Sequence, residues 1–468
     1  MKPVIVLVGR PNVGKSTLFN RLTRGRDALV ADVPGLTRDR QYGDGKRGGR
    51  SYLVVDTGGI LEDLERGARN QQVSIESMMQ EQTRQAIDEG DAIVFMVDGR
   101  EGITPADKEL ANYLRRTSKP VTVAVNKAEG LEPDVVMAEF HQLGLDQPVA
   151  ISAKRGDGVD ALVKHVLADF PESEKAEIDV DVPRVAVAGR PNVGKSTLIN
   201  SMLGEQRVVV FDEPGTTRDS IRVPVKRGDN SYVFIDTAGV RRKGRVHETI
   251  EKFSVVKTLQ AIEEANVVIL VLDADQGLSE QDASLAGYIL EKGRALVVAV
   301  NKCDKVTQER RQWVERELAR RFAFITFLRP HFISALNGTG VAGLFKSIDR
   351  AFASACKTLG TSQLNRVLQQ AVQATQPPMH QGRRIKPKFA HQGGKNPPLV
   401  IIHGNQVSHL PESYLRYLAN AFRKAFRLEG TPVRIECREG ENPYKEKKTN
   451  KTKTYKKGAK SREHRRHR

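Results

Sequence analysis

The stretch Gly9-Arg-Pro-Asn-Val-Gly-Lys-Ser16 occurs twice, because residues 189–196 repeat all eight letters without a change. Each copy follows a short apolar run, Val4–Val8 or Val185–Ala188, and has the Gly-x-x-x-x-Gly-Lys-Ser pattern of a phosphate-binding loop, or P-loop. The glycines let backbone N–H groups curl around phosphate oxygens, and the following helix adds the positive end of its dipole. Two such loops predict two nucleotide-binding domains in tandem.

Further apolar runs of strand length follow each loop and alternate with helical stretches. In the first repeat the expected strands are Val4–Val8, Tyr52–Asp56, Ala92–Asp98, Val121–Asn126 and Val149–Ser152, with helices from Lys15 and near 74–89, 105–116 and 158–169. In the second repeat they are Val185–Ala188, Tyr232–Asp236, Val267–Asp273, Leu296–Asn301 and Pro330–Ser334. This alternation predicts the α/β class, with a mostly parallel six-stranded sheet in each repeat and helices on both of its faces.

The remaining sequence differs in kind. We expect a first nucleotide domain at 1–170, an acidic linker at 171–183, a second nucleotide domain at 184–355, a small α+β domain at 356–440 and a basic, disordered tail at 441–468. In the small domain the order is helix, strand, strand, helix, strand. The expected elements are Thr361–Gln373, Arg384–His391, Leu399–His403, Pro411–Arg427 and Val433–Arg438.

Composition narrows the class of protein. The longest apolar runs have the length of strands, whereas a membrane-spanning helix needs about 20 residues. The three cysteines, Cys303, Cys356 and Cys437, lack metal-ligand spacing, which favours a reducing cytoplasm. The formal net charge is +18, and residues 441–468 hold twelve Lys or Arg against three Glu. Such a tail favours a polyanion such as RNA, and the alternative is a solubilising tail without a fixed partner.

Each P-loop supplies side chains for the phosphates and for a metal ion. Lys15 and Lys195 are expected to reach the β- and γ-phosphates, and the hydroxyls of Ser16 and Ser196 are expected to ligate Mg²⁺. This chemistry predicts hydrolysis or transfer of a nucleotide phosphate.

The sequences Asp56-Thr-Gly-Gly59 and Asp236-Thr-Ala-Gly239 lie at the same offset as the two P-loops. Each Asp closes an apolar strand, so we expect it to hold Mg²⁺ through water at the sheet edge near the phosphates. Each final Gly, without a Cβ, can bring its N–H to the γ-phosphate.

Between these motifs the sequence Pro-Gly-x-Thr-Arg-Asp places Thr37 and Thr217 in a loop. A loop threonine that completes the Mg²⁺ shell only when a γ-phosphate is present acts as a switch. The predicted magnesium ligands are Ser16, Thr37, Asp56, Ser196, Thr217 and Asp236.

The base is predicted by Asn126-Lys-Ala-Glu129 and Asn301-Lys-Cys-Asp304, each after an apolar strand. A carboxylate there accepts hydrogen bonds from N1–H and the exocyclic amine of guanine, donors that adenine does not present together. Ser152-Ala153 and Ser334-Ala335 follow, where a backbone N–H is expected to reach guanine O6. The prediction is GTP and GDP, and the alternative class is a P-loop kinase or ATPase.

The full set of expected nucleotide contacts comes from these motifs in both repeats. In the first repeat they are Gly9, Arg10, Pro11, Asn12, Val13, Gly14, Lys15, Ser16, Thr17, Asp56, Thr57, Gly58, Gly59, Asn126, Lys127, Glu129, Ser152 and Ala153. In the second they are Gly189, Arg190, Pro191, Asn192, Val193, Gly194, Lys195, Ser196, Thr197, Asp236, Thr237, Ala238, Gly239, Asn301, Lys302, Asp304, Ser334 and Ala335.

Two GTPase repeats with these motifs, followed by a small basic α+β domain, resemble the bacterial Der (EngA) family of GTPases over residues 1 to about 440. The resemblance implies a KH-like third domain and a cytoplasmic GTP-hydrolysing switch that acts in biogenesis of the large (50S) ribosomal subunit. Its implied partners are that subunit, rRNA and other assembly factors, with no membrane and a monomeric chain. The alternatives are an RNA-binding scaffold with purely regulatory nucleotide sites and a membrane-associated Era-like GTPase.

The resemblance also bears on the rate of hydrolysis. Ile60 and Val240 stand where a water-orienting Gln stands in Ras-like enzymes, which implies slow basal turnover. Related GTPases hold a monovalent cation partly through a P-loop Asn, and Asn12 and Asn192 match that position, which implies stimulation by K⁺. The residues expected to act on the reaction are Lys15, Lys195, Thr37, Thr217, Gly59, Gly239, Asn12 and Asn192.

Overall fold

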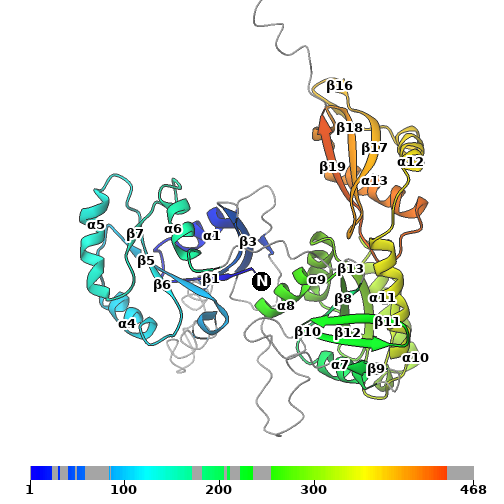
Figure 1. Cartoon of the computed structure of the whole chain (residues 1–468), viewed down its shortest axis with the longest axis horizontal. Helices are drawn as coiled ribbons and strands as arrows, with labels where there is room; N and C mark the ends of the chain where they lie inside the picture. The colour runs from blue at the N-terminus through cyan, green and yellow to red at the C-terminus, as the bar shows by residue number, and fades with distance from the viewer. Residues whose placement is uncertain are drawn as a thin grey trace, which may run out of the picture. The chain divides into compact units, whose positions relative to one another are not determined.

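A computed structural model describes residues 2–23, 30–31, 41–47, 50–57, 84, 86–170, 182–204, 208–210, 222–235 and 255–439. The chain divides into two compact units, Met1–Phe352 and Ala353–Arg468, and both P-loop repeats belong to the first unit (Figure 1). The expected acidic linker and basic tail fall almost wholly outside the described residues.

The first repeat forms one sheet whose central strands are parallel. Its strand order is β2 (Val30–Ala31), β3 (Gln41–Arg47), β4 (Arg50–Asp56), β1 (Val4–Val8), β5 (Ala92–Asp98), β6 (Val121–Asn126) and β7 (Val149–Ala150). Pairs β2–β3 and β3–β4 are antiparallel, and the other pairs are parallel.

Successive side chains of β1 enter two different cores, because side chains alternate across a strand. Ile5 and Leu7 pack in the cluster that contains α1 (Lys15–Thr23) and α6 (Val159–Val166). Val4, Val6 and Val8 pack in the cluster that contains residues of α4 (Pro105–Leu114) and α5 (Pro133–Phe140). The sheet is therefore covered on both faces, as predicted.

The second repeat has the same plan. Its strand order is β14 (Pro330–Phe332), β13 (Ala295–Asn301), β12 (Val267–Asp273), β8 (Arg184–Ala188), β11 (Asn230–Ile235), β10 (Arg222–Arg227) and β9 (Val208–Val210). Helices α7 (Lys195–Leu203) and α11 (Val341–Ala355) contribute to one buried cluster. Helices α8 (Val255–Glu264), α9 (Glu280–Glu291) and α10 (Gln308–Arg321) contribute to the other. In the part of the chain that the structure describes, 3₁₀ turns lie at His141–Leu143 in the first repeat, Cys303–Lys305 in the second and Val407–His409 in the second unit.

The prediction of mostly parallel sheets is confirmed, and among the described residues each sheet contains seven paired strands, one more than the six predicted. The strands without a sequence signal are β2 and β3 in the first repeat and β9 and β10 in the second. Strand β3 reads QYGDGKR and β10 reads RVPVKR, so neither contains the continuous apolar run that marks a strand buried on both faces. The helices expected at 105–116 and 158–169 are present as α4 and α6, whereas most of 74–89 lies outside the described residues.

The second unit has the predicted order of helix, strand, strand, helix and strand. Its elements are α12 (Thr361–Ala374), β17 (Lys386–Gly394), β18 (Leu399–Asn405), α13 (Glu412–Ala425) and β19 (Arg434–Glu439). Strand β18 is central, antiparallel to β17 and parallel to β19. The sequence did not indicate the short hairpin of β15 (Met379–His380) and β16 (Arg383–Arg384), which has only two residues in each strand.

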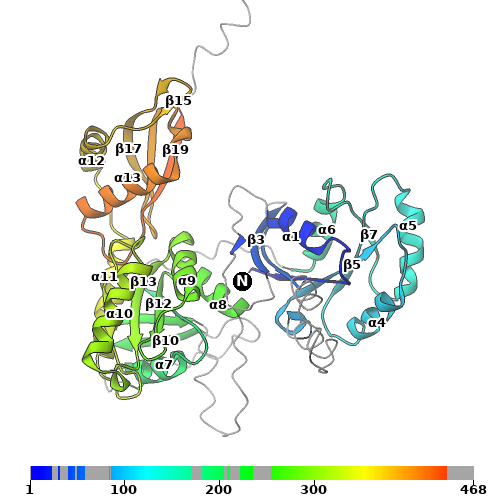
Figure 2. The same ribbon diagram turned by 180° about the vertical axis from the view of Figure 1, so that it is seen from behind.

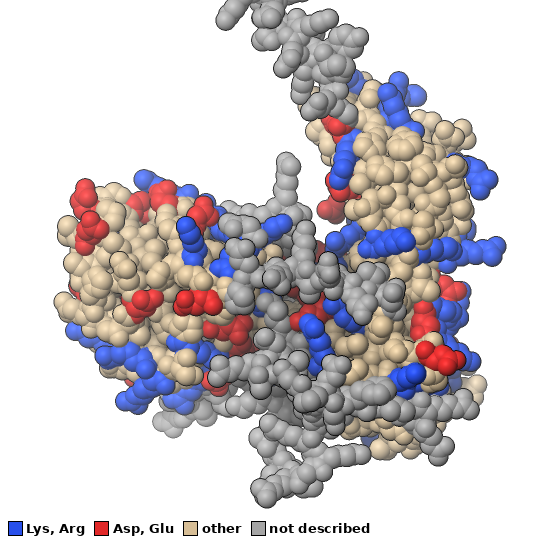
Figure 3. Space-filling model, viewed as in Figure 1, with Lys and Arg blue, Asp and Glu red and all other residues tan. Residues whose placement is uncertain are grey.

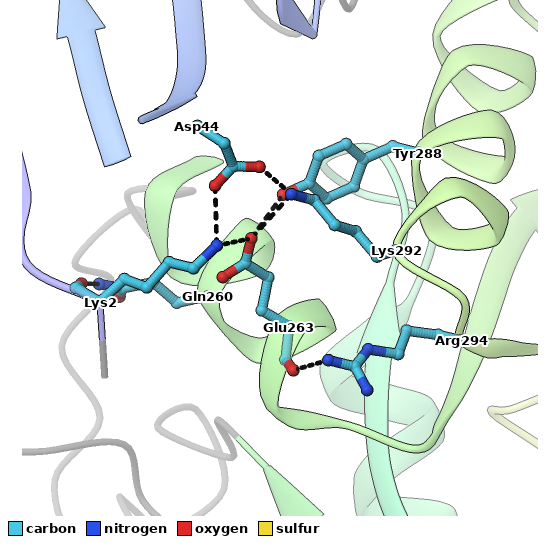
Figure 4. Close-up of polar contacts among 7 residues, drawn as sticks. All are labelled: Lys2, Asp44, Gln260, Glu263, Tyr288, Lys292 and Arg294. Carbon is cyan, nitrogen blue, oxygen red and sulfur yellow. Dashed lines mark hydrogen bonds and ion pairs between the residues drawn. The ribbon is translucent and has the colours of Figure 1, made fainter. Parts of the chain in front are cut away.

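A cluster of four charged side chains joins the two repeats inside the first unit (Figure 4). The Nζ of Lys2, just before β1, lies 3.0 Å from Asp44 of β3 and 2.8 Å from Glu263 of α8. Lys292, after α9, pairs with the same two carboxylates and lies 3.0 Å from Glu263. We call these four residues the charge junction. Each lysine contacts both carboxylates, so the formal charges of the junction cancel.

The surroundings of the junction limit its access to water. Asp44, Glu263 and Lys292 are only 9%, 11% and 15% exposed. Tyr288 lies beneath Lys292, with the ammonium 5.0 Å from the ring centre, and Gln260 donates to the backbone carbonyl of Lys2. Burial raises the pKa of Tyr288 well above its usual value.

Among the described residues, no helix is long and apolar enough to cross a membrane.

Candidate nucleotide-binding sites

The two P-loops have the same backbone conformation. Asn12 and Asn192 adopt left-handed φ angles of 63° and 61°, and Gly14 and Gly194 adopt 99° and 96°. A Cβ on either glycine would lie less than 3.0 Å from the amide nitrogen of an asparagine behind the loop. Only glycine fits there, and the resulting concave loop at a helix N-terminus is a cradle for phosphate oxygens.

The P-loop lysines lie over this cradle. The Nζ of Lys15 donates to the carbonyls of Gly9 and Arg10, both at 2.8 Å, and Lys195 donates to the carbonyl of Arg190 at 2.8 Å. These contacts hold each ammonium at the loop, in the place where the sequence analysis put phosphate binding.

The arginine of each P-loop anchors the loop to a neighbouring helix. Arg190 contacts Asp282 at 3.0 Å, and Arg10 lies 3.4 Å from Asp107 and 2.5 Å from Glu101. Both aspartates are fully buried and cap their own helices, α9 and α4, through capping boxes. These side chains therefore fix the outer arm of the loop, a task that the sequence analysis did not assign to them.

Two of the three metal ligands predicted in the first repeat, Ser16 and Asp56, lie at one edge of the sheet. Asp56 ends β4, is 1% exposed and pairs in register with Leu7, two residues before the P-loop. Thr57 donates to the carbonyl of Leu7 at 2.8 Å, and Ser16 lies in the first turn of α1.

One hydroxyl and one carboxylate, both hard oxygen donors, fit Mg²⁺ that is also held by phosphates. Among the described residues, no three His, Cys, Asp or Glu side chains gather as a separate metal site. Thr37, Gly58, Gly59, Thr217, Asp236, Thr237, Ala238 and Gly239 lie outside the described residues, and their roles stay predictions.

The asparagine of each base-recognition motif bridges two loops. Asn301 donates from Nδ2 to the carbonyl of Val193 and accepts from the N–H of Ala335, both at 2.9 Å. Asn126 makes the matching bonds to Val13 at 2.7 Å and Ala153 at 2.8 Å. We call this pair of bonds the asparagine bridge. It ties the phosphate loop to the loop expected at the guanine O6 and so fixes the position of one end of a nucleotide site relative to the other.

A buried aspartate supports the lysine of the same motif, and the sequence analysis did not identify it. Lys127 lies 2.5 Å from Asp98, and Lys302 lies 2.6 Å from Asp273. Burial, the largest influence, would raise the pKa of Asp98, but the bond from Lys127 and the backbone N–H of Arg100 lower it overall. Both aspartates end apolar strands in matching positions, and that signal could have found them.

The carboxylates expected to read guanine are held in the charged form. A hydrogen bond from Ser152 lowers the pKa of Glu129, and a hydrogen bond from Ser334 lowers the pKa of Asp304. An ionised carboxylate accepts two hydrogen bonds, which is the chemistry that selects guanine. Each serine is buried beside its carboxylate.

The two base sites differ in one neighbour. Arg100 lies 3.5 Å from the Glu129 carboxylate and donates to the backbone carbonyl of that residue at 3.3 Å. In the second repeat the matching position, two residues after the buried aspartate, is Asp275. The first carboxylate therefore has an arginine beside it at a position where the second repeat has an aspartate.

Residues 4–127 and 184–302 match the family described as "50S ribosome-binding GTPase", and residues 359–438 match the "KH-domain-like of EngA bacterial GTPase enzymes, C-terminal" family. GTPase Der of Thiobacillus denitrificans is 58% identical over 450 residues, which cover 96% of this chain and 94% of the relative. The chain belongs to the GTPase Der family. GTPase Der of an Azoarcus species is 57% identical, covering 95% of this chain and 99% of the relative. GTPase Der of Vibrio cholerae is 53% identical, covering 96% of each.

Membership of the Der family confirms the resemblance found in the sequence. The protein is a GTP-binding switch protein of tandem GTPase domains with a KH-like C-terminal domain, and the alternative of a P-loop kinase or ATPase is set aside. Family membership implies guanine nucleotide with Mg²⁺ and GTP hydrolysis.

Proposed function

We propose that this GTPase binds the large ribosomal subunit or its precursors and acts in 50S biogenesis, with GTP hydrolysis as the timer of binding. One observation carries the proposal: two nucleotide sites with intact asparagine bridges are joined to a KH-like unit in a chain of net charge +18. A basic chain favours a polyanion such as rRNA. The description of the matched family as 50S ribosome-binding supports the choice of subunit.

In this proposal each site divides its tasks among the residues described above. Lys15 and Lys195 bind the β- and γ-phosphates. Ser16, Thr37 and Asp56 would hold Mg²⁺ in one site, and Ser196, Thr217 and Asp236 would hold it in the other. Bound with the nucleotide, the ion neutralises charge on the phosphate oxygens.

The γ-phosphate is the only difference between GTP and GDP, so a change of domain arrangement must come from groups that contact it. We assign this task to Thr37 and Gly59 and to Thr217 and Gly239. A ligand shifts a conformational equilibrium only through different affinities for the two states. Binding of the subunit in the GTP state alone is the expected consequence.

We further propose slow basal turnover that K⁺ accelerates, with Asn12 and Asn192 helping to hold the cation. Each lies at the tip of its P-loop in an exposed, left-handed position, where its side chain is free of the core. Turnover is to be compared in K⁺ and Na⁺ at equal ionic strength. Equal rates would remove K⁺ from the proposal without affecting the rest.

The deciding experiment is co-sedimentation of the full chain with purified 50S subunits, with a non-hydrolysable GTP analogue or with GDP. We expect the protein in the pellet with the analogue and in the supernatant with GDP. A Lys15→Ala, Lys195→Ala double variant is the control for nucleotide dependence. Absence from the pellet in both states would contradict the proposal, and equal binding in both states would contradict the switch.

A further inference from the structure

The net positive charge of the chain comes entirely from the residues after 355. Residues 1–355 contain fifty Lys or Arg and fifty Asp or Glu, so the two GTPase domains together are formally neutral. Residues 356–440 contain thirteen Lys or Arg against four Glu. The KH-like unit therefore carries about half of the net charge and the tail carries the rest, which directs attention to the surface of this unit.

The three-stranded sheet of this unit has two unlike faces. Helices α12 and α13 cover one of them, where Ala390, Val400 and Ile402 join Leu368 and Leu418 in the core. Figure 2 shows α13 in front of the strands, and Figure 1, from the other side, shows the strands in front of α13. We call the face away from these helices the outer face.

Register places three ring-bearing residues together on the outer face. Ala390 pairs with Ile402 toward the helices, so the flanking pairs Phe389–His403 and His391–Ile401 face the other way. The rings of His391 and His403 are stacked at 5.1 Å with planes 16° apart, and Phe389 lies 5.8 Å and 6.1 Å from them. We call these three residues the ring platform.

One ring of the platform, that of Phe389, is exposed to solvent. Phe389 is 43% exposed, although a phenylalanine on a small domain is ordinarily buried. The exposed ring of Phe389, with the two imidazoles beside it, offers an aromatic contact that suits a planar group such as a nucleobase.

Cations lie along the same strands. A register shift between Pro387 and Phe389 interrupts the alternation of β17, and exposed Lys388 lies at this shift, next to Phe389. Exposed Lys386 pairs with Asn405, two residues from His403 on β18, and so lies on the outer face. Arg438 of β19 pairs in register with His403. Arg438 lies 2.7 Å from Glu436, the acidic neighbour on this face. Figure 3 shows Lys and Arg side chains around the margin of this unit and few acidic ones.

We propose that the outer face binds single-stranded RNA, with bases stacked on the ring platform and phosphates beside Lys386, Lys388 and Arg438. The positive charge of the unit favours a polyanion as its ligand, and the exposed ring favours a polyanion whose bases are unstacked. A duplex keeps its bases stacked inside and offers no π-face to a flat protein surface. The inference rests on the proposed function for its RNA source, and it names the surface and the form of RNA.

The test measures binding of a labelled, unstructured RNA of about 12 nucleotides, a length within the usual single-strand site range. The full chain is used at about 0.3 M salt to suppress the contribution of the tail. We expect Phe389→Ala to weaken binding about tenfold, the usual effect of losing one stacked base, and Phe389→Tyr to retain it. Lys388→Ala should instead reduce the dependence of RNA affinity on salt concentration, because it removes one contact to a phosphate. Met379→Ala removes another exposed apolar side chain of this unit and should change nothing.

GTP hydrolysis should be unchanged in all four variants, because these residues lie outside the nucleotide sites. RNA binding by Phe389→Ala equal to the wild type would overturn the proposal, as would an equal loss with duplex RNA. Displacement of the RNA by poly-glutamate at equal charge would assign the face to an acidic protein instead and overturn it too. If wild-type protein still co-sediments with 50S subunits only in the GTP state, such results refute the ring platform and leave the proposed function standing.

Discussion

Replacement of Asn301 by alanine should open the second nucleotide site and destabilise the fold around it. The side chain is 3% exposed and makes two hydrogen bonds of 2.9 Å, to Val193 and to Ala335. The variant leaves a buried carbonyl and a buried N–H without partners, at about 1–3 kcal/mol each. Partial relaxation of the loops lowers the sum, so we expect about 3 kcal/mol.

The assay is hydrogen exchange of the amides of 189–204 and 330–340 in the full chain, because local opening is measured there without assuming two-state unfolding. Opening should become about 100-fold more frequent, the equivalent of about 3 kcal/mol. Asn337→Ala, in the exposed turn that follows, is the matched control. Asn301→Asp keeps the acceptor for Ala335 but faces a carbonyl with a carboxylate, so it should be no more stable than Asn301→Ala.

The result that would refute this reasoning is a variant with unchanged exchange and lost GTP binding. The Asn301 side chain would then act on the base alone, and the asparagine bridge would contribute nothing to the stability of the two loops. Asn126→Ala repeats the test in the first repeat, where the bonds are 2.7 Å and 2.8 Å long.

Three further predictions use other features of the same unit. Gly194→Ala, which forces a Cβ against Asn301 at φ 96°, should abolish nucleotide binding at the second site in calorimetry while the first site still binds. Ser152→Ala removes the hydrogen bond that lowers the pKa of Glu129 below its ordinary 4.5, so as the pH is lowered the variant should become protonated, and lose GDP affinity, at a higher pH than the wild type. GDP affinity is to be measured against pH with the second site silenced by Lys195→Ala, and superimposable pH profiles would contradict the assignment. Glu263→Gln leaves two lysines on one carboxylate in the charge junction and should lower the free energy of unfolding by about 2 kcal/mol, measured by denaturant titration. The control Glu264→Gln should lower it by less than about 1 kcal/mol, because its partner Arg222 is exposed.

The sequence predicted best what depends on long apolar runs and on glycine. The P-loops could be located because only glycine adopts the φ of Gly14 and Gly194, and strands such as Val267–Asp273 could be located because burial on both faces requires an unbroken apolar run. Strand β3, between β2 and β4, was missed for the opposite reason, since QYGDGKR contains no apolar run. Its pairing with β4 begins at Arg47 and Arg50, and Gly48-Gly49 between them in the sequence is the hairpin signal that could have located it.

Side-chain tasks were harder to predict than positions. Asn126 and Asn301 were expected at the nucleotide, and the structure gives them a bridge between two loops that are far apart in sequence. Asp98 and Asp273 were missed, although each ends an apolar strand just as Asp56 does. A motif names a residue, whereas its hydrogen bonds depend on which loops the sheet brings together.

The cation beside Glu129 gives the tandem arrangement a quantitative consequence. Arg100 competes with guanine for the first carboxylate, and Asp304 has no arginine at the matching position, so we expect the first site to bind GTP more weakly. A tenfold gap needs only about 1.4 kcal/mol. Sites of unequal affinity fill in sequence as GTP concentration rises, which creates an interval in which one is loaded and the other is not. With two unequal sites the chain would have three loading states, whereas a single site has two.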